Sequence, residues 1–444
     1  METDRLDLKP AGGTGRLNPV RNVKSIGLPS GSPGLFHGYW IVVAAFACLF
    51  IFSGLGYYAF GLFVTPIQSD LGWGRADIMA AFTVFFLVQG LASPLIGWAI
   101  YIVEPRKMIA AGALAVTLGF ILLSQMEDHR SFYLSYALVG AGMAAMGHVP
   151  VSTVVSNWFK RRRGTAIGIA STGIGAGGLV LAPLIGGYLI PAFDWRICYL
   201  SMGMLATVVT VPVALFVLRT KPADMGLHPY GVHASETVSL TADTATNVPG
   251  LSLRKALRTP ALWLAMVAYF FGGFSGTGAL QNQVAYLGDV GFPITIAVGA
   301  LGGIGLGSLV GKFAFGWLCD RIAARHAYAV ALALQIIGIT ILMSLDSSSH
   351  YAILWLYAGI MGLGLGGWLP TMSMIVSDNF GLAAYGTIFG VVNIAQSVGV
   401  AAGPLLGGYV YDSVGAYHWA FVIYLGLFAI SIPSLLVMRR PTLL

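Results

Sequence analysis

Apolar stretches of about twenty residues recur along nearly the whole chain from Tyr39 onward, separated by short polar segments. Coiled as a helix, a stretch of that length crosses the roughly 30 Å hydrocarbon core of a bilayer. The pattern predicts an all-α membrane protein with twelve membrane-spanning helices. They are expected at residues 39–65, 76–103, 107–125, 132–157, 164–190, 196–218, 260–287, 292–318, 326–345, 351–377, 384–410 and 418–438.

Three polar regions divide the chain. Residues 1–35 are rich in Gly, Pro and Arg and lack the apolar core of a cleaved signal peptide, which predicts a disordered N-terminal tail. Residues 219–258 contain the stretch ASETVSLTADTATNVPG, which predicts a linker between two six-helix bundles at 36–218 and 259–438. Residues 439–444 are expected to form a short C-terminal tail.

The two halves repeat one another at a nearly constant spacing. The matching segments are Gly97-Trp98 with Gly316-Trp317, His148-Val149-Pro150 with Trp368-Leu369-Pro370, Gly164-Thr165 with Gly386-Thr387, and PLIGGYL at Pro183 with PLLGGYV at Pro404. Because each copy holds an even number of spans, both copies enter the membrane from the same side. This predicts a parallel pseudo-two-fold repeat with a cavity between the halves, the arrangement of an alternating-access carrier.

Charged residues make up only 9% of the chain, against roughly 25% in soluble domains. All Lys and Arg residues except Arg75, Arg130, Arg196 and Lys312 fall in segments on the same side as the N-terminus. The positive-inside rule therefore places both termini in the cytoplasm and the protein in the cell membrane. The net charge of +7 then reflects topology and attraction to anionic lipid, not nucleic-acid binding.

Nothing in the motifs indicates a cofactor or an enzyme. Cys48, Cys198 and Cys319 have no paired spacing, so we expect neither a disulfide nor a metal site. GIGAGG at Gly173 and GLGLGG at Gly362 match a dinucleotide-binding pattern, but both lie inside predicted spans, where glycines let helices approach closely. We therefore expect no bound nucleotide.

Two titratable side chains are predicted at depth in the membrane. Lys312 lies roughly 13 Å along its helix from Arg321, too deep for comfortable snorkelling to the interface. It is expected to bind an anionic substrate, because no acid lies at comparable depth; the alternatives are a bond to a backbone carbonyl and a place in the lining of the cytoplasmic vestibule. His148, about 15 Å from Trp158 and on one face with Ser152, is the candidate proton carrier. Its alternative role is donation to a carbonyl freed by Pro150.

Other polar or aromatic residues within spans are weaker candidates for substrate contact. They are Tyr57 and Tyr58, Trp368 with Thr371, Asn393 with Gln396, and the consecutive Gln281, Asn282 and Gln283. The last three follow the segment GGFSGTG, which we expect to be irregular and to line a cavity. Consecutive helical residues cannot all face one way, so one or two of the three would contact substrate. The alternative for every one of these residues is a packing role.

At the ends of two spans the sequence resembles the major facilitator superfamily. GWLCDRIAARH from Gly316 is similar to the family's G-x-x-x-D-R loop motif, with Asp320 and Arg321 in the expected places. The N-terminal copy, GWAIYIVEPRK, has Tyr101 and Ile102 at those positions. The resemblance implies that Asp320 and Arg321 form a latch that holds the cytoplasmic ends of the halves together.

Within that superfamily, NWFKRRRGTAIGIASTGIGAGG from Asn157 and HGYWIV at His37 resemble signatures of the monocarboxylate porters and the bacterial oxalate/formate antiporters. The transport arginine of those porters corresponds to Lys312, and an aspartate one turn earlier corresponds to Ser308. A lysine after their first-span YAFP corresponds to Leu62, after YAFG. The resemblance implies a retained cation for the substrate and a lost carboxylate for proton handling.

We therefore predict a secondary active transporter of a small organic anion, in the first place a monocarboxylate, working by proton symport or anion exchange. Its expected partners are the substrate anion, a proton or counter-anion and the lipid bilayer, and a monomer is expected to suffice. Two alternatives stay open: the same fold moving a neutral or cationic solute such as a drug or sugar, and a ligand sensor without net flux.

Overall fold

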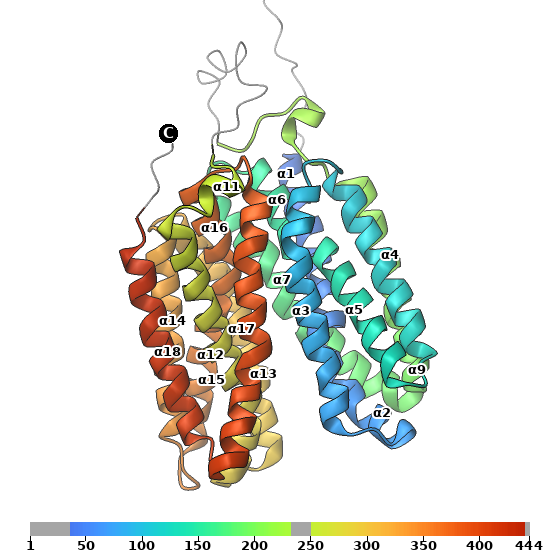
Figure 1. Cartoon of the computed structure of the whole chain (residues 1–444), viewed down its shortest axis with the longest axis vertical. Coiled ribbons are helices and arrows are strands. Elements are labelled where there is room, and N and C mark those ends of the chain that lie inside the picture. The colour runs from blue at the N-terminus through green and yellow to red at the C-terminus, as the bar shows by residue number, and fades with distance from the viewer. Residues whose placement is uncertain (1–35, 232–249, 440–444) are drawn as a thin grey trace, which may run out of the picture. The chain divides into compact units, whose positions relative to one another are not determined.

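The computed structural model describes residues 36–231 and 250–439, which are almost entirely helical (Figure 1). The predicted tails at 1–35 and 440–444 and the centre of the linker, 232–249, lie outside the described residues. The main helices are α1 (His37–Ile51), α2 (Val64–Leu71), α3 (Arg75–Ala99), α4 (Pro105–Ser124), α5 (His129–Met146), α6 (His148–Trp158), α7 (Arg163–Leu184), α8 (Ile190–Ala192), α9 (Trp195–Pro212), α11 (Leu253–Ala256), α12 (Pro260–Val290), α13 (Ile294–Cys319), α14 (Ala324–Met343), α15 (Tyr351–Gly366), α16 (Trp368–Phe380), α17 (Tyr385–Val414) and α18 (His418–Val437).

Twelve helical segments in the described part of the chain are long and apolar enough to cross a membrane. They run over His37–Phe63, Ala80–Ala99, Pro105–Ser124, His129–Trp158, Arg163–Ala192, Trp195–Val217, Pro260–Val290, Gly299–Cys319, Ala324–Met343, Tyr351–Phe380, Tyr385–Tyr411 and His418–Val437. These segments agree with the predicted spans to within a few residues except at the starts of the second and eighth. The prediction of an all-α protein with twelve spanning helices is confirmed.

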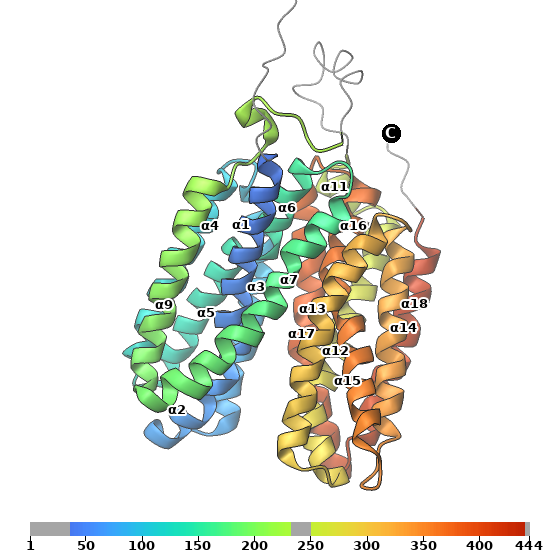
Figure 2. The same cartoon turned by 180° about the vertical axis from the view of Figure 1, so that it is seen from behind.

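Residues from His37 onward form one compact unit, in which two pairs of helices join the halves of the repeat. The second span, α3, packs on the eleventh, α17, and the fifth span, α7, packs on the eighth, α13. Figure 1 shows the first pair and Figure 2, from behind, the second. The predicted domain boundaries at 218 and 259 stay predictions, since the halves are not separate units.

Glycines at equivalent repeat positions allow both inter-half crossings. A Cβ at Gly97 of α3 would lie 2.0 Å from the carbonyl oxygen of Gly386 in α17. In the other pair, a Cβ at Gly316 of α13 would lie 2.5 Å from the carbonyl oxygen of Gly164 in α7. Backbone meets backbone at both places, so a larger residue would force the helices apart. These contacts bring the ends of the four helices together at the end of the bundle that carries the linker.

In the described part of the chain, five spans contain irregular turns or interruptions, and none of them is the span that the sequence indicated. The fifth and sixth contain π-helical turns at Ile185–Leu189 and Val213–Val217. The first span passes from α1 into a π-helical turn at Phe52–Tyr58 and a 3-10 turn at Phe60–Phe63. The fourth and tenth are interrupted at Gly147, between α5 and α6, and at Gly367, between α15 and α16. The prediction of irregular backbone at GGFSGTG was wrong, because α12 is continuous over Pro260–Val290.

The glycines of that segment provide space for neighbouring side chains instead of freeing the backbone. A Cβ at Gly278 would lie 2.5 Å from the ring of Tyr424, and one at Gly276 would lie 2.6 Å from Oε1 of Gln335. The glycine face of α12 therefore receives large side chains from two other helices. Small residues serve this purpose within membranes without breaking a helix.

The described ends of the predicted linker pair with the loops after the fourth and tenth spans. Tyr230 N–H donates to the carbonyl of Trp158 (2.9 Å), and Leu251 N–H donates to the carbonyl of Phe380 (2.8 Å). The two attachments follow equivalent repeat positions. The linker is thus held to both halves at the end where the latch residues lie.

Candidate functional site

A cavity of about 810 Å³ lies between the halves and is lined by both of them. The spans that contribute side chains include the irregular first and fourth, together with α12, α13 and α17. Nine of the predicted site residues line it: Tyr57, Tyr58, Leu62, His148, Gln281, Lys312, Trp368, Asn393 and Gln396. Residues that are distant in the sequence therefore converge on one solute-sized space.

Lys312 provides the one lining side chain with a full positive charge among the described residues. It is only 2% exposed, and its Nζ donates to Oγ of Ser308 one turn earlier on α13. In the described part of the chain it forms no ion pair, and no Asp or Glu lines the cavity. A buried ammonium without a counter-charge is costly, and an anion in the cavity would offset that cost.

His148 begins α6 directly after the interruption at Gly147. Its ring lies between two others, edge-to-face with Phe52 at 4.5 Å and with Trp368 at 5.1 Å between centroids. Its Nδ1 is buried and has no hydrogen-bond partner among the described residues. The alternative prediction, a bond to a carbonyl freed by Pro150, is therefore not observed at Nδ1. Pro150 lies in the first turn of α6, where helices tolerate a missing N–H.

The His148–Trp368 contact joins equivalent positions of the repeat. Each ring begins the second part of an interrupted span, the fourth in one half and the tenth in the other. One turn further on, the hydroxyl of Ser373 donates to Oγ of Ser152 at 3.3 Å. The two interruptions thus bring two pseudo-symmetric side chains into contact where the fourth and tenth spans meet between the halves.

Four of the predicted site residues do not line the cavity. Thr371 is buried, and its hydroxyl is hydrogen-bonded to that of Tyr269 at 2.9 Å. Ser152 is 2% exposed and hydrogen-bonded to Ser373. Asn282 Nδ2 donates to the carbonyl of Gly278 at 2.8 Å, and Gln283 Oε1 accepts a hydrogen bond from the Tyr357 hydroxyl. These groups form hydrogen bonds within the helix bundle, and only the buried Nε2 of Gln283 among them has no hydrogen-bond partner in the described chain. The neighbouring Gln281 lines the cavity instead, because successive helical residues differ by about 100° in direction.

Several polar lining residues were not singled out from the sequence: Gln89, Tyr328, Gln335 and Ser397. Three of the glutamines that line the cavity carry buried atoms without a hydrogen-bond partner in the described chain, namely Gln89 Nε2, Gln335 Oε1 and Gln396 Oε1. In the sequence, only the residue type could have indicated the glutamines, because an amide in an apolar span needs a polar partner. The cavity therefore offers unused hydrogen-bonding groups beside its cation.

At the linker end, Asp320 binds the other half of the molecule. Its carboxylate accepts hydrogen bonds from the backbone N–H groups of Gly164 (2.8 Å) and Thr165 (2.7 Å), and from the Thr165 hydroxyl. A carboxylate at the start of α7 satisfies free amides and complements the helix dipole. Arg321 does not share this contact: it is exposed, and its guanidinium lies 3.5 Å above the ring of Trp317.

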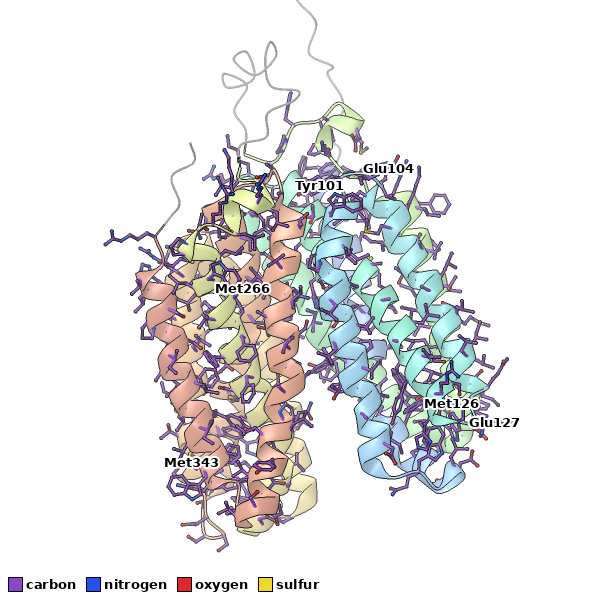
Figure 3. All side chains as sticks on the ribbon, viewed as in Figure 1. Tyr101, Glu104, Met126, Glu127, Met266 and Met343 are labelled. Carbon is purple, nitrogen blue, oxygen red and sulfur yellow. The ribbon has the colours of Figure 1, made fainter. Side chains whose placement is uncertain are left out.

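Tyr101 makes the equivalent contact in the other inter-half crossing. It occupies the repeat position of Asp320, and its hydroxyl accepts a hydrogen bond from Gly386 N–H (3.1 Å) at the start of α17. Figure 3 labels Tyr101 near Glu104 at the linker end of the bundle. In the same loop, a hydrogen bond from Arg106 lowers the pKa of the Glu104 carboxyl below its ordinary value. One crossing thus uses a carboxylate and the other a phenol.

Replacing Asp320 with asparagine should weaken the closed linker end. Loss of a charge at a helix N-terminus costs about 1–2 kcal/mol, which corresponds to an increase of about 5- to 30-fold in the population open at that end. The measurement is maleimide labelling, from the linker side, of a cysteine placed at Gln89 in an otherwise cysteine-free protein. Asp346→Asn, an exposed acid at the opposite end, is the control. Equal labelling in both variants would reject the latch.

Replacing Tyr101 with phenylalanine should open the same end to a smaller extent. It removes one neutral hydrogen bond, worth about 0.5–1.5 kcal/mol, and the labelling should rise by about 2- to 10-fold. Tyr133→Phe is the matched control, because the Tyr133 hydroxyl donates to the carbonyl of Asp77 at the opposite end. A Tyr101→Phe variant that labels as slowly as wild type would show that only the carboxylate side closes the molecule.

Fold and cavity together define the class: a polytopic helical membrane protein with a solute-sized cavity between two pseudo-symmetric halves. The sequence profile described as Major Facilitator Superfamily matches residues 46–312 and 300–443. The chain belongs to that superfamily, and it is a transporter and not an enzyme.

The relatives by sequence include anion transporters. The chain is 26% identical over 393 residues to monocarboxylate transporter 13 of Rattus norvegicus, a match that covers 86% of this chain and 85% of the relative. It is 24% identical over 397 residues to the oxalate:formate antiporter of Oxalobacter formigenes, covering 88% and 89%. The predicted resemblance to this group is confirmed.

Solved structures show the same fold. The human organic anion transporter MFSD10 matches with a TM-score of 0.67 at 16% identity, over 90% of this chain and 99% of that structure. The fucose:proton symporter of E. coli matches with a TM-score of 0.65 at 15% identity, over 90% and 100%.

Proposed function

We propose that the protein is a secondary active carrier for a small organic monocarboxylate, working by proton symport or anion exchange. The observation that carries this proposal is Lys312: a buried cation, 2% exposed, on a cavity that has no lining acid among the described residues. An anionic substrate provides the missing counter-charge. The names of the sequence relatives, monocarboxylate transporters and an oxalate:formate antiporter, agree with an anion.

Alternating access supplies the transport cycle. Both halves line the cavity, and the contacts of Asp320 and Tyr101 close the molecule at the linker end. The positive-inside rule places that end, with both termini, in the cytoplasm of a cell membrane. In that orientation the proposed cycle includes an outward-facing state closed by the two latch contacts, and breaking these contacts exposes the cavity to the cytoplasm.

The titratable groups that line the cavity decide whether transport can be coupled to a proton. Ser308, which bonds Lys312, stands where the related porters have an aspartate, so a carboxylate at that position cannot carry the proton. His148 is the remaining lining side chain whose reference pKa is near physiological pH. Proton symport would use His148; anion exchange would need only Lys312.

Uptake into proteoliposomes tests the function. The purified chain is reconstituted, and the entry of labelled lactate, oxalate and a neutral amino acid is followed with and without an inward proton gradient. We expect lactate uptake that Lys312→Gln abolishes. Acceleration by the gradient indicates symport, whereas acceleration by preloaded unlabelled lactate without a gradient indicates exchange.

The same measurement separates the alternatives. Uptake of a neutral or cationic solute that Lys312→Gln leaves unchanged would overturn the anion proposal and make Lys312 structural. Saturable binding of lactate to the detergent-solubilised chain, with no uptake under either condition, would indicate a ligand sensor.

A further inference from the structure

The two halves contribute chemically different surfaces to the cavity. Four rings from the first and second spans, Tyr57, Phe60, Phe82 and Phe86, line it on the N-terminal side, and we call them the aromatic wall. They contact one another in sequence: Phe60 and Phe82 are 4.9 Å apart between centroids, Phe82 and Phe86 4.7 Å, and Tyr57 and Phe86 5.8 Å. A continuous surface of rings binds apolar or aromatic groups.

The C-terminal half contributes most of the polar surface. Its lining side chains include Lys312, Ser308 and four amides, Gln281, Gln335, Asn393 and Gln396. Gln335 is 3% exposed and Gln396 is 8% exposed, and each has an Oε1 without a hydrogen-bond partner among the described residues. Buried amides in that condition are costly unless a ligand supplies the missing bond. The polar groups of a substrate are therefore drawn to this half.

Along the membrane normal, the aromatic wall and the cation also lie at different levels. Phe82 is near the start of α3, at the end of the bundle opposite the linker, whereas Lys312 is near the end of α13, at the linker end. Seven residues separate Phe82 from Arg75, and seven separate Lys312 from Cys319, which is about 10 Å of helix in each case. Phe86 lies one turn further along α3 than Phe82, so Phe86 and the ring of Tyr57 that contacts it are the part of the wall nearer to the level of Lys312. A substrate that contacts both Lys312 and these rings must extend along the cavity.

We propose that the substrate is an aryl monocarboxylate, with its carboxylate on Lys312 and its ring on the aromatic wall. This inference rests on the proposed function and specifies the substrate of the same site. A cavity of about 810 Å³ is far larger than a two- or three-carbon acid and falls in the range of drug-sized ligands. While His148 is neutral, a second carboxylate would face rings and amides without a counter-ion, so a dicarboxylate should bind more weakly because of its desolvation cost.

Binding to the full-length chain, measured by calorimetry, tests the inference with four probes. They are lactate, 3-phenyllactate, phenylsuccinate and 1-phenyl-2-propanol, which vary the ring and the carboxylates separately. We expect 3-phenyllactate to bind at least about tenfold more tightly than lactate, because a buried ring adds the transfer free energy of a large apolar group. Phenylsuccinate should bind more weakly than 3-phenyllactate, and the uncharged alcohol should not bind.

Variants of the aromatic wall connect the effect to the ring. Phe86→Ala should weaken 3-phenyllactate binding by about tenfold or more, and it should weaken lactate binding much less, so that the preference for the aryl acid is lost. Phe86→Leu, which keeps apolar volume and protects the fold, should lose part of the preference. Phe216→Ala, at a ring that is 76% exposed and outside the cavity, is the control and should change nothing.

The outcomes separate this inference from the proposed function. If lactate and 3-phenyllactate bind equally and both need Lys312, the carrier proposal stands and the aryl preference is overturned. An equal loss of affinity for both ligands in Phe86→Ala, or no loss of affinity for 3-phenyllactate, also overturns it. If neither carboxylate needs Lys312, the proposed function itself fails.

Discussion

Lys312→Gln should abolish measurable binding and uptake of the substrate anion, while Lys312→Arg should retain part of both. Removing one partner of a buried charge pair costs about 2–5 kcal/mol, which corresponds to a loss of affinity of about 30- to several thousand-fold. Arginine keeps the positive charge but presents it in a rigid planar fork, so it replaces the ammonium imperfectly. The measurement is the affinity for lactate or 3-phenyllactate, followed by proteoliposome uptake.

The controls distinguish lost binding from lost folding. Lys107→Gln removes an exposed cation at the linker end, where Lys107 pairs with Glu104, and should leave binding unchanged. Thermal stability of Lys312→Gln without substrate should equal or exceed that of wild type, because the variant removes a buried charge that has no acid partner in the described chain. Substrate should raise the melting temperature of wild type and fail to do so in the variant. Unchanged affinity in Lys312→Gln would reject the assignment.

His148→Gln should remove the pH dependence of substrate affinity. When His148 is protonated, the cavity holds a second positive charge beside Lys312, and an anion binds more tightly. Affinity in wild type should therefore fall as pH rises from about 5 to 8, the window around the reference histidine pKa. Coupling between two ligands is typically about 5- to 150-fold, and the proton and substrate must favour each other equally. Glutamine is neutral and keeps a donor and an acceptor, so its curve should be flat.

The aromatic side chains that contact His148 do not titrate, which simplifies the comparison of wild type with His148→Gln. Its two ring neighbours, Phe52 and Trp368, do not titrate, and the charged group that shares the cavity is Lys312. Trp368→Phe, which keeps a ring at the pseudo-symmetric position, serves as the control and should preserve the slope. Parallel curves for wild type and His148→Gln would assign the histidine a packing role and favour anion exchange over symport.

The sequence predicted one of the two latch contacts, that of Asp320, but not the one made by Tyr101. Asp320 was expected to hold the halves together, because the loop motif can be recognised from its residues alone, and it does contact the start of α7. Tyr101 was read as a lost acid. Its hydroxyl still caps the start of α17, which became visible only when the α3–α17 crossing was known. Arg321, expected beside Asp320 in the latch, lies over Trp317 on its own helix.

The sequence by itself determined the twelve spans, the internal repeat and the burial of Lys312. Each of these depends on a local rule: the hydrocarbon thickness sets the length of an apolar stretch, and the helical rise sets how deep a residue lies. The tertiary structure alone decided which face of each helix meets the cavity. Gln281 lines it while Asn282 and Gln283 do not, and Gln89 and Gln335 line it unpredicted. The rotation of a helix about its axis is set by contacts between distant segments, such as the glycine crossings of α3 with α17 and of α7 with α13, and no local pattern records it.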